Sequence, residues 1–191
     1  MPDMDITAAI AAFNAQAEAQ GWDQFCDASL SYGHGDFAAV LALWKTHARG
    51  RTLPARADMS ARALKTYLPH IALKERVQEN PSRYRWRLTG TRVAQIIGER
   101  TGKFTDEDAP PQLVARWNAS CDLVLSACTP LRFVGRVLAN NKDYLSSDLL
   151  FMPLADAQGA PRFVMGFGHY SADGSWREVV RDMRLADVAR A

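Results

Sequence analysis

The stretch RYRWRLTGTRVAQIIGERTG, residues 83–102, constrains the fold most, because its periodicity changes halfway. Its first half alternates arginines with Tyr84, Trp86 and Leu88, which is the two-residue period of a strand with one face on a core and one in water. Its second half predicts a short helix over residues 91–97, and the glycines that follow end this helix and shape a loop. The chain therefore contains a strand, a turn and a short helix in immediate succession.

The other elements follow from periodicity and turn signals along the rest of the chain. Helices are predicted over residues 5–20, 36–50, 110–128 and 175–190, with a short helix within 60–70. Strands are predicted over residues 71–79, 83–90, 131–139, 143–155 and 162–170. Residues 22–35 show no clear period, so we interpret them as a connector. Five antiparallel strands, with short and long helices inserted between the second and third, indicate an α+β fold rather than a parallel α/β one.

This order divides the chain into three parts. We expect an N-terminal helical extension over residues 1–35, the α+β domain over 36–172 and a C-terminal helix over 173–191. The terminal helices carry apolar stripes without an obvious core of their own, so they are expected to form a homodimer or to bind a partner. The stripes consist of Ile6, Ile10 and Phe13 in the first helix and of Trp176, Val179, Val180 and Met183 in the last.

Charge and cysteine content limit the class of protein. A formal net charge of +2 over 191 residues is too small to indicate nucleic acid or a membrane as the partner. Three cysteines without CxxC spacing favour neither a disulfide framework nor a cysteine-rich zinc site. No apolar run approaches the roughly 20 residues that span a bilayer, and the acidic N-terminus is unlike a secretory signal. We therefore expect a cytoplasmic protein.

Four pieces of the chain are together similar to a known family. They are LWKTHARGRTLPARADMS, LKTYLPHIAL, RYRWRLTGTRVAQIIGERTGK and LLFMPLADAQGAPRFVMGFGHY, within residues 41–170. With the element order, they make the chain resemble the PAS domain, most closely a bacterial single-domain PAS family formerly of unknown function. The resemblance implies a five-stranded sheet cupped around short helices, with a cavity that holds a small molecule in some relatives. It also implies a non-catalytic sensory module that acts in signalling through a small apolar ligand, a protein partner or both.

The two best-known cofactor chemistries of such domains lack their usual anchors in this sequence. A flavin adduct uses a cysteine in the loop after the short helix, but GERTGKF, residues 98–104, has none. Haem in some relatives is ligated by a histidine of the long helix, and residues 110–128 contain none. We therefore expect neither a covalent flavin adduct nor helix-ligated haem. Noncovalent flavin, and haem on His169 or another histidine, stay open.

Six apolar residues and one histidine are expected nearest the cavity, some of them as plain core packing. They are Tyr84, Trp86, Ile96, Trp117, Phe133, Phe167 and His169. His169 follows Phe167 in the last strand and would bond a ligand if it points into the cup. The four histidines, at positions 34, 47, 70 and 169, never show the i, i+3 or i, i+4 spacing of a helical metal site, so no metal site is predicted.

The charged residues and glycines have ordinary structural explanations. Residues 90–102 lack both GxGxxG and GxxxxGK[ST] spacing, so a phosphate-binding loop is not predicted. The arginines of RYRWRL, with Arg132 and Arg136 on another strand, favour a solvated sheet face over nucleic-acid binding. Arg56 and Asp58 favour an ion pair that tethers an irregular segment.

Two other functions stay open at this level. A small enzyme would use the same cup with a buried acid or base, His169 or Asp148, because an apolar pocket shifts the pKa of such a group towards neutrality. No GxSxG elbow appears, and no cysteine stands near a histidine in the sequence, so nucleophilic catalysis has no local signal. A ligand-free structural scaffold is the remaining alternative.

Overall fold

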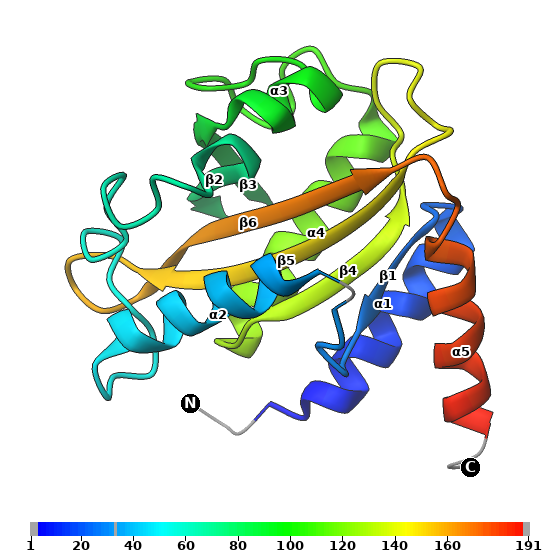
Figure 1. Ribbon diagram of the computed structural model, residues 1–191, viewed down its shortest axis with the longest axis horizontal. Coiled ribbons are helices and arrows are strands. Elements are labelled where there is room, and N and C mark those ends of the chain that lie inside the picture. Colours follow the sequence, from blue (N-terminus) through cyan, green and yellow to red (C-terminus); the bar gives the residue numbers. More distant parts are fainter. Residues whose placement is uncertain (1–3, 33, 189–191) are drawn as a thin grey trace.

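The computed structural model describes residues 4–32 and 34–188, and a single antiparallel sheet lies at its centre (Figure 1). The spatial order of the strands is β1-β4-β5-β6-β2-β3. Their bounds are β1 Gln24–Asp27, β2 Ile71–Glu79, β3 Ser82–Thr89, β4 Leu131–Arg136, β5 Ser146–Ala155 and β6 Pro161–Ser171. The helices are α1 Ile6–Gln20, α2 Gly35–Ala48, the 3-10 helix η1 Leu68–His70, α3 Thr91–Ile97, α4 Pro111–Ala127 and α5 Trp176–Val188. The predicted α+β class is confirmed, with α3 and α4 inserted between β3 and β4.

The sheet has six strands where the sequence predicts five. The additional strand, β1, comes from the segment interpreted as a connector and pairs antiparallel with β4. Gly135 of β4 makes this pairing possible, because a Cβ at that position would lie 2.2 Å from the carbonyl oxygen of Asp23. All four residues of β1 are buried, so no alternation of polar and apolar side chains marks it in the sequence.

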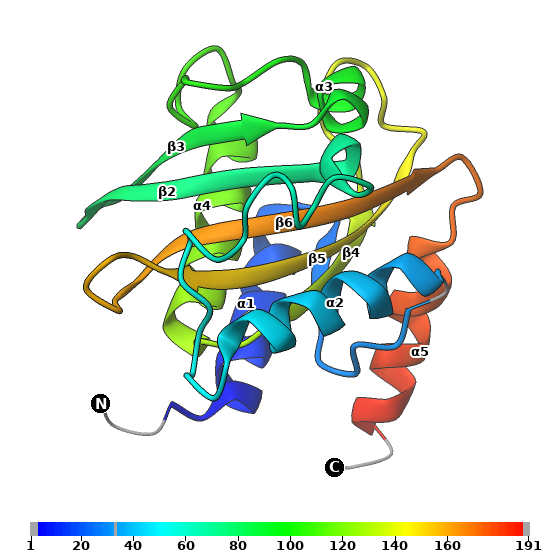
Figure 2. The same cartoon turned by 60° about the vertical axis from the view of Figure 1, so that its left-hand side comes forward.

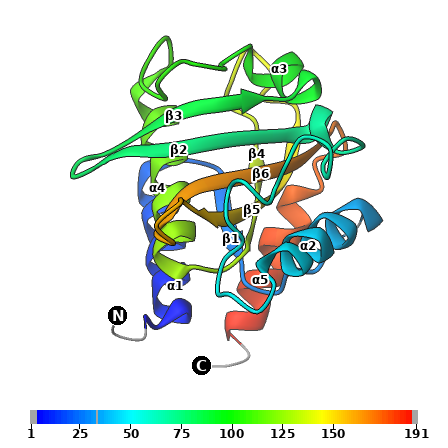
Figure 3. The same ribbon diagram turned by 90° about the vertical axis from the view of Figure 1, so that its left-hand side faces the viewer.

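Helices cover both faces of the sheet (Figure 3). On one side, here called the inner face, lie α1 and α4, with α3 at the edge formed by β3 (Figures 2 and 3). On the other side, the outer face, lie α2 and α5. Trp44 of α2 donates its indole N–H to the carbonyl oxygen of Pro153 in β5, at 2.8 Å. Both faces of the central strands are therefore buried, whereas antiparallel sheets commonly leave one face in contact with solvent.

The apolar stripes of the terminal helices pack on the core of their own chain. Ile10 and Phe13 of α1 are buried in a cluster that includes Phe133, and the Phe13 and Phe133 rings meet edge to face at 5.3 Å. Val180 of α5 is buried in the same cluster. Ile6, Trp176, Val179 and Met183 are half-buried against it. The reason for expecting a dimer through these stripes is thus removed, and oligomeric state stays a prediction.

The short helix expected within residues 60–70 is wrong for most of its length. Residues 61–67 form successive turns, and only η1 is helical. The β3–α3 turn packs against the end of this segment. Gly90 of the turn donates its backbone N–H to the carbonyl oxygen of Ile71, the residue after η1, at 2.7 Å. A Cβ at Gly90 would lie 2.1 Å from the carbonyl oxygen of Leu68. The close contact between the segment around η1 and the β3–α3 turn therefore requires glycine at this position.

The strand alternation predicted for β3 breaks at its end. Tyr84 and Trp86 are buried on the inner face, but Leu88 packs with the cluster of the outer face. A register shift between β2 and β3 at this point pairs Lys74 with Trp86 and Leu73 with Leu88. An extra residue in one strand moves the following side chains to the opposite face, so the prediction that Leu88 shares a face with Trp86 is wrong.

Among residues 4–32 and 34–188, no helix combines the length and apolar character that a bilayer crossing requires.

Candidate ligand-binding site

A cavity of about 60 Å³ lies on the inner face, between the sheet and helices α3 and α4. Because a water needs at least about 10–15 Å³ of such space and takes up about 30 Å³ in the liquid, the cavity has room for a molecule of only a few non-hydrogen atoms. Most of its wall is apolar. The apolar lining includes Ala72, Trp86, Val93, Ile97, Leu113, Trp117, Val137, Leu138, Leu149, Phe151 and Val164, and the polar lining includes Gln24, His70, Lys74, Arg116, Ser147 and Tyr170.

Small residues on β6 shape the floor of this cavity. A Cβ at Gly166 would lie 2.9 Å from the Phe151 ring, and a Cβ at Gly168 would lie 2.7 Å from a methyl group of Leu149. The two glycines thus allow these β5 side chains to lie across the neighbouring strand. Side-chain positions on the inner face of β6 that would otherwise fill the cavity are therefore empty.

Lys74 is the most unusual residue of the cavity, because its side chain is buried without an ionic partner. The residue is 4% exposed and forms no ion pair with any carboxylate of the described residues. Its ammonium nitrogen lies 4.4 Å from the ring centroid of Trp86, 5.4 Å from that of Trp117 and 5.5 Å from that of Phe151. Three aromatic rings therefore surround the charge and stabilise it through their faces.

Within residues 4–32 and 34–188, the Lys74 ammonium forms one hydrogen bond, and it is weak. The ammonium nitrogen of Lys74, in β2, donates to the sulfur of Cys121, in α4, at 3.7 Å. Burial lowers the pKa of Lys74 below its usual value, and the charge of Arg116 lowers it further. Burial also raises the pKa of the Cys121 thiol. The thiol therefore stays neutral at physiological pH and does not balance the lysine's charge.

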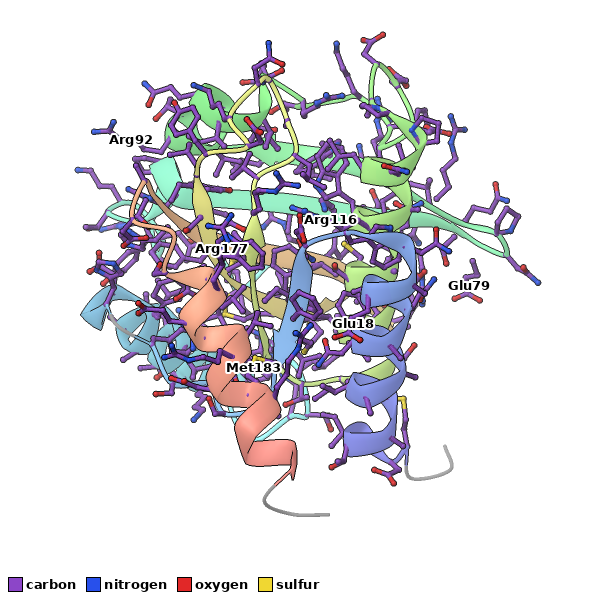
Figure 4. The ribbon with its side chains drawn as sticks, turned by 90° about the vertical axis from the view of Figure 1, so that its right-hand side faces the viewer. Glu18, Glu79, Arg92, Arg116, Arg177 and Met183 are labelled. Atoms are coloured by element: carbon purple, nitrogen blue, oxygen red, sulfur yellow. The ribbon has the colours of Figure 1, made fainter. Side chains whose placement is uncertain are left out.

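Arg116 brings a second buried cation to the same cavity. It is 4% exposed, and Figure 4 shows it inside the molecule while Arg92 and Glu79 lie at the periphery. One guanidinium nitrogen donates to the carbonyl oxygens of Trp22 and Arg136, at 2.8 and 2.9 Å. Burial lowers the pKa of Arg116 to about 10, so it stays protonated at neutral pH. Arg116 thus joins the ends of β1 and β4 and adds positive charge to the cavity wall.

No carboxylate belongs to the described residues that line the cavity. Two acidic residues of neighbouring segments have partners of their own: Asp23 binds Arg136 at 2.6 Å, and Asp122 accepts the hydrogen bond of the Tyr84 hydroxyl. Burial raises the pKa of Tyr170 to about 12, so this lining phenol is neutral at physiological pH. The cavity is therefore positive as well as apolar.

Three of the seven residues expected at the cavity line it. These are Trp86, Trp117 and Phe167, and the two tryptophan rings pack edge to face at 5.3 Å. Tyr84 and Phe133 are buried in the core between the sheet, α1 and α4, and Ile96 packs beside the cavity without lining it. His169 lies on the outer face. The expected site therefore falls partly on the cavity and partly on the surrounding core.

Lys74 and Arg116 are the lining residues that sequence reasoning missed. Lys74 follows Ile71 and Leu73 in strand alternation, so it reads as a solvent-facing position. A signal existed for Arg116, which lies three residues after Leu113 on the apolar stripe of its helix. A charged residue on an apolar stripe indicates either an edge position or a functional one.

Three histidines meet on the outer face. The His169 ring of β6 stacks on His34 at 4.4 Å and on His70 at 5.1 Å, measured between ring centroids. Asp36, near the start of α2, lies 3.8 Å from the Nε2 atom of His169. Burial lowers the pKa of His169, and the neighbouring histidines lower it further. The three histidines are far apart along the chain, so nothing in the sequence indicated this cluster. Within the described residues, no group of three or more His, Cys, Asp or Glu side chains is arranged to hold a metal ion.

The two residues named for an enzymatic alternative both lie outside the cavity. His169 belongs to the histidine cluster, and Asp148 accepts two hydrogen bonds from Arg132, which also binds Asp27. This network joins β1, β4 and β5 on the outer face. It also accounts for Arg132, which the sequence suggested as part of a solvated basic stripe and which is buried instead.

The one charge pair predicted from the sequence and the predicted basic stripe of β3 also differ in the structure. Asp58 pairs with Arg51, whereas Arg56 donates to the carbonyl oxygen of Met59 at 3.1 Å, so the expected Arg56–Asp58 pair is wrong. On β3, Arg83 binds Asp106 at 3.0 Å and Arg87 pairs with Glu75. The basic stripe is thus interrupted by acidic partners.

The family model that matches this chain agrees with the observed fold. The chain matches the family model described as PAS domain over residues 34–168. It is 15% identical to a sensory box histidine kinase/response regulator from Burkholderia thailandensis, with a TM-score of 0.39, over 69% of this chain and 100% of that one. It is 14% identical to an RNA-binding light-oxygen-voltage receptor, with a TM-score of 0.39, over 72% of this chain and 40% of that one. The search of curated proteins gives no match.

Proposed function

The chain belongs to the PAS domain family, whose members are sensory signalling modules, and we propose that it senses a small molecule bound in the inner-face cavity. The observation that carries this proposal is the cavity itself, which lies between the sheet and helices α3 and α4 and is lined by Trp86, Trp117 and Lys74. Binding sites for small molecules are typically mostly apolar hollows with a few polar groups, as this one is.

We propose a non-catalytic role because neither residue named for an enzyme lines the cavity, and because we assign Lys74, a titratable residue that does, to ligand binding. Catalysis by acid and base requires titratable groups within hydrogen-bond reach of a substrate. The two candidates from the sequence, His169 and Asp148, lie on the outer face, and Asp148 is held by Arg132. The cavity instead offers hydrogen-bond donors, which suit recognition of a ligand. We propose that the signal passes to a protein partner in the cytoplasm.

A route from the cavity to the outer surface supports such signalling. His70 and Gly168 line the cavity, and the Nδ1 atom of His70 lies 3.2 Å from the carbonyl oxygen of Gly168. The same histidine stacks on His169 of the outer-face cluster. A ligand that moves this end of β6 thus changes the contacts of α2, which begins at the cluster. We propose α2 and its surroundings as the surface that a partner reads.

A cavity-filling substitution tests the proposed function. Ala72→Leu adds a side chain to the cavity wall and should abolish binding of whatever small molecule the protein retains, because the added atoms occupy the space. Ala38→Leu, at an exposed position of α2, is the matched control and should retain binding. The readout is native mass spectrometry of the full chain, followed by denaturation and identification of the released compound, with circular dichroism to check folding.

Three results would contradict the proposed function. A compound bound equally by wild-type protein and Ala72→Leu would place the ligand outside the cavity. A protein that is empty after purification and shows no change in tryptophan fluorescence with any small-molecule class would favour the structural scaffold. Turnover that persists in Ala72→Leu would also contradict a sensory role for this cavity.

A further inference from the structure

The inner-face cavity is lined by two buried basic side chains, Lys74 and Arg116, and by no carboxylate among the described residues. Lys74 and Arg116 are both 4% exposed. Removing a charge from water is strongly unfavourable unless a partner of opposite charge replaces the lost hydration. Arg116 has two backbone carbonyl acceptors and the charge of Asp23 nearby, whereas Lys74 has no carboxylate partner among the described residues. Lys74 therefore leaves the cavity electrostatically incomplete in the absence of a ligand.

The interactions that Lys74 makes within the chain do not replace an anion. The aromatic rings around its ammonium accept no conventional hydrogen bond, and the Cys121 thiol is a weak acceptor at 3.7 Å. The adjacent Glu75 pairs with Arg87 and Arg162, at the other side of the strand. The ammonium therefore has donor protons left for a ligand.

Two further donors of the lining residues are also unused. The indole N–H of Trp86 and the Nε–H of Arg116 are buried without an acceptor among the described residues. Unsatisfied buried donors are rare in folded proteins, and each one costs stability. Donors thus outnumber acceptors around this cavity, which is the pattern expected at a site for an anion.

We propose that the sensed ligand is a short-chain alkyl carboxylate, whose carboxylate binds Lys74 and Arg116 and whose alkyl chain lies against the apolar wall. This inference rests on the proposed function and names the ligand class of the same cavity. The volume of about 60 Å³ limits the ligand to a few non-hydrogen atoms, and acetate, propionate and butyrate are the short-chain carboxylates of this small size. An inorganic anion shares the charge but leaves apolar residues such as Val137 and Leu138 without contact.

The ligand class is tested by titrating the full chain with matched small molecules at constant ionic strength. Butyrate, butyramide and butylamine have nearly the same shape and differ in charge, while nitrate and phosphate carry charge without an alkyl chain. Isothermal titration calorimetry and the fluorescence of Trp86 and Trp117 report binding. We expect saturable binding of butyrate, at least tenfold weaker binding of butyramide and of the inorganic anions, and no binding of butylamine.

Substitution of the lysine links binding to the proposed contact. Lys74→Met keeps the length of the side chain and removes its charge, so butyrate affinity should fall at least tenfold. Lys45→Met, at an exposed position of α2, is the control and should bind butyrate as the wild type does. Because Lys74→Met also alters packing, the wild-type ligand series above decides the question on its own if this variant folds poorly.

The outcomes separate this inference from the proposed function. Butyramide bound as tightly as butyrate, or an unchanged affinity in Lys74→Met, would overturn the carboxylate assignment while the cavity stays a ligand site. Nitrate or phosphate bound as tightly as butyrate would assign the site to inorganic anions instead. If no carboxylate binds and no released compound is found by mass spectrometry, both proposals fail.

Discussion

Arg132 of β4 binds both carboxylate oxygens of Asp148 in β5, with its Nε at 2.9 Å and its Nη2 at 2.7 Å. The remaining nitrogen, Nη1, lies 2.9 Å from Asp27 of β1. Arg132 and Asp27 are 6% and 5% exposed. One arginine thus holds three strands together at the edge where the sequence predicted no strand. The planar guanidinium suits this arrangement, because it donates to several carboxylate oxygens at once.

Removal of this arginine should destabilise the fold strongly. Arg132→Met leaves the buried Asp27 and the half-buried Asp148 without their cation, so the free energy of unfolding should fall by about 3–5 kcal/mol. Arg83→Met is the matched control, because Arg83 and Asp106 form an exposed pair that contributes no more than about 1 kcal/mol. Denaturant unfolding followed by circular dichroism measures both. Equal effects of the two substitutions would contradict the structural role of Arg132.

Removal of the Lys74 charge should instead stabilise the fold. Lys74→Met replaces a buried cation without an ionic partner by an apolar side chain, which should raise the free energy of unfolding by about 1–3 kcal/mol at pH 7. A side chain that lowers the stability of the fold is expected to be kept where function requires it. Lys45→Met should change stability little.

The difference in free energy of unfolding between Lys74→Met and the wild type should become smaller as pH rises. The pKa of Lys74 is lowered in the folded protein, so the unfolded chain binds the proton more tightly. Wild-type stability therefore rises as pH increases from the folded pKa to the unfolded value of 10.5. The difference between the variant and the wild type should shrink from pH 7 to pH 10. A difference that stays constant would mean that packing, not charge, explains it.

The histidine cluster should make stability sensitive to mild acid. Because the folded pKa of His169 is below the unfolded value of 6.5, its contribution is complete above pH 6.5 and is lost as pH falls through the folded pKa. His34 and His70 add to this effect by repulsion, while Asp36 and Asp148 oppose it. His169→Gln should flatten the stability profile below pH 6.5, measured by denaturant midpoints. His47→Gln, outside the cluster, should leave the slope unchanged.

The N-terminal helix should behave as part of the core. Phe13 is 5% exposed and contacts both Trp22 and Phe133, so Phe13→Ala should lower the free energy of unfolding by about 3–5 kcal/mol. Light scattering should give the same mass for the folded variant and the wild type. A change of mass without loss of stability would restore the terminal helix as a dimer surface.

The sequence by itself determined the elements that depend on local periodicity. The alternation in residues 83–86, the helical stripe of residues 113–124 and the turn at Gly90 predicted β3, α4 and the strand-to-helix junction correctly. These signals are local because a side chain's face in a strand or helix follows from its spacing along the chain. The family resemblance rested on the same stretches and is confirmed by the match over residues 34–168.

Only the tertiary structure decided which faces are buried and which distant residues meet. Lys74 reads as solvent-facing in the alternation of β2, and it is buried because α4 covers that face of the sheet. β1 is stabilised by a strand more than 100 residues away, and four residues are too few for a period. Lys74 and Arg116 belong to one cavity because the sheet and helix pack against each other, a relation between faces that spacing along the chain does not encode.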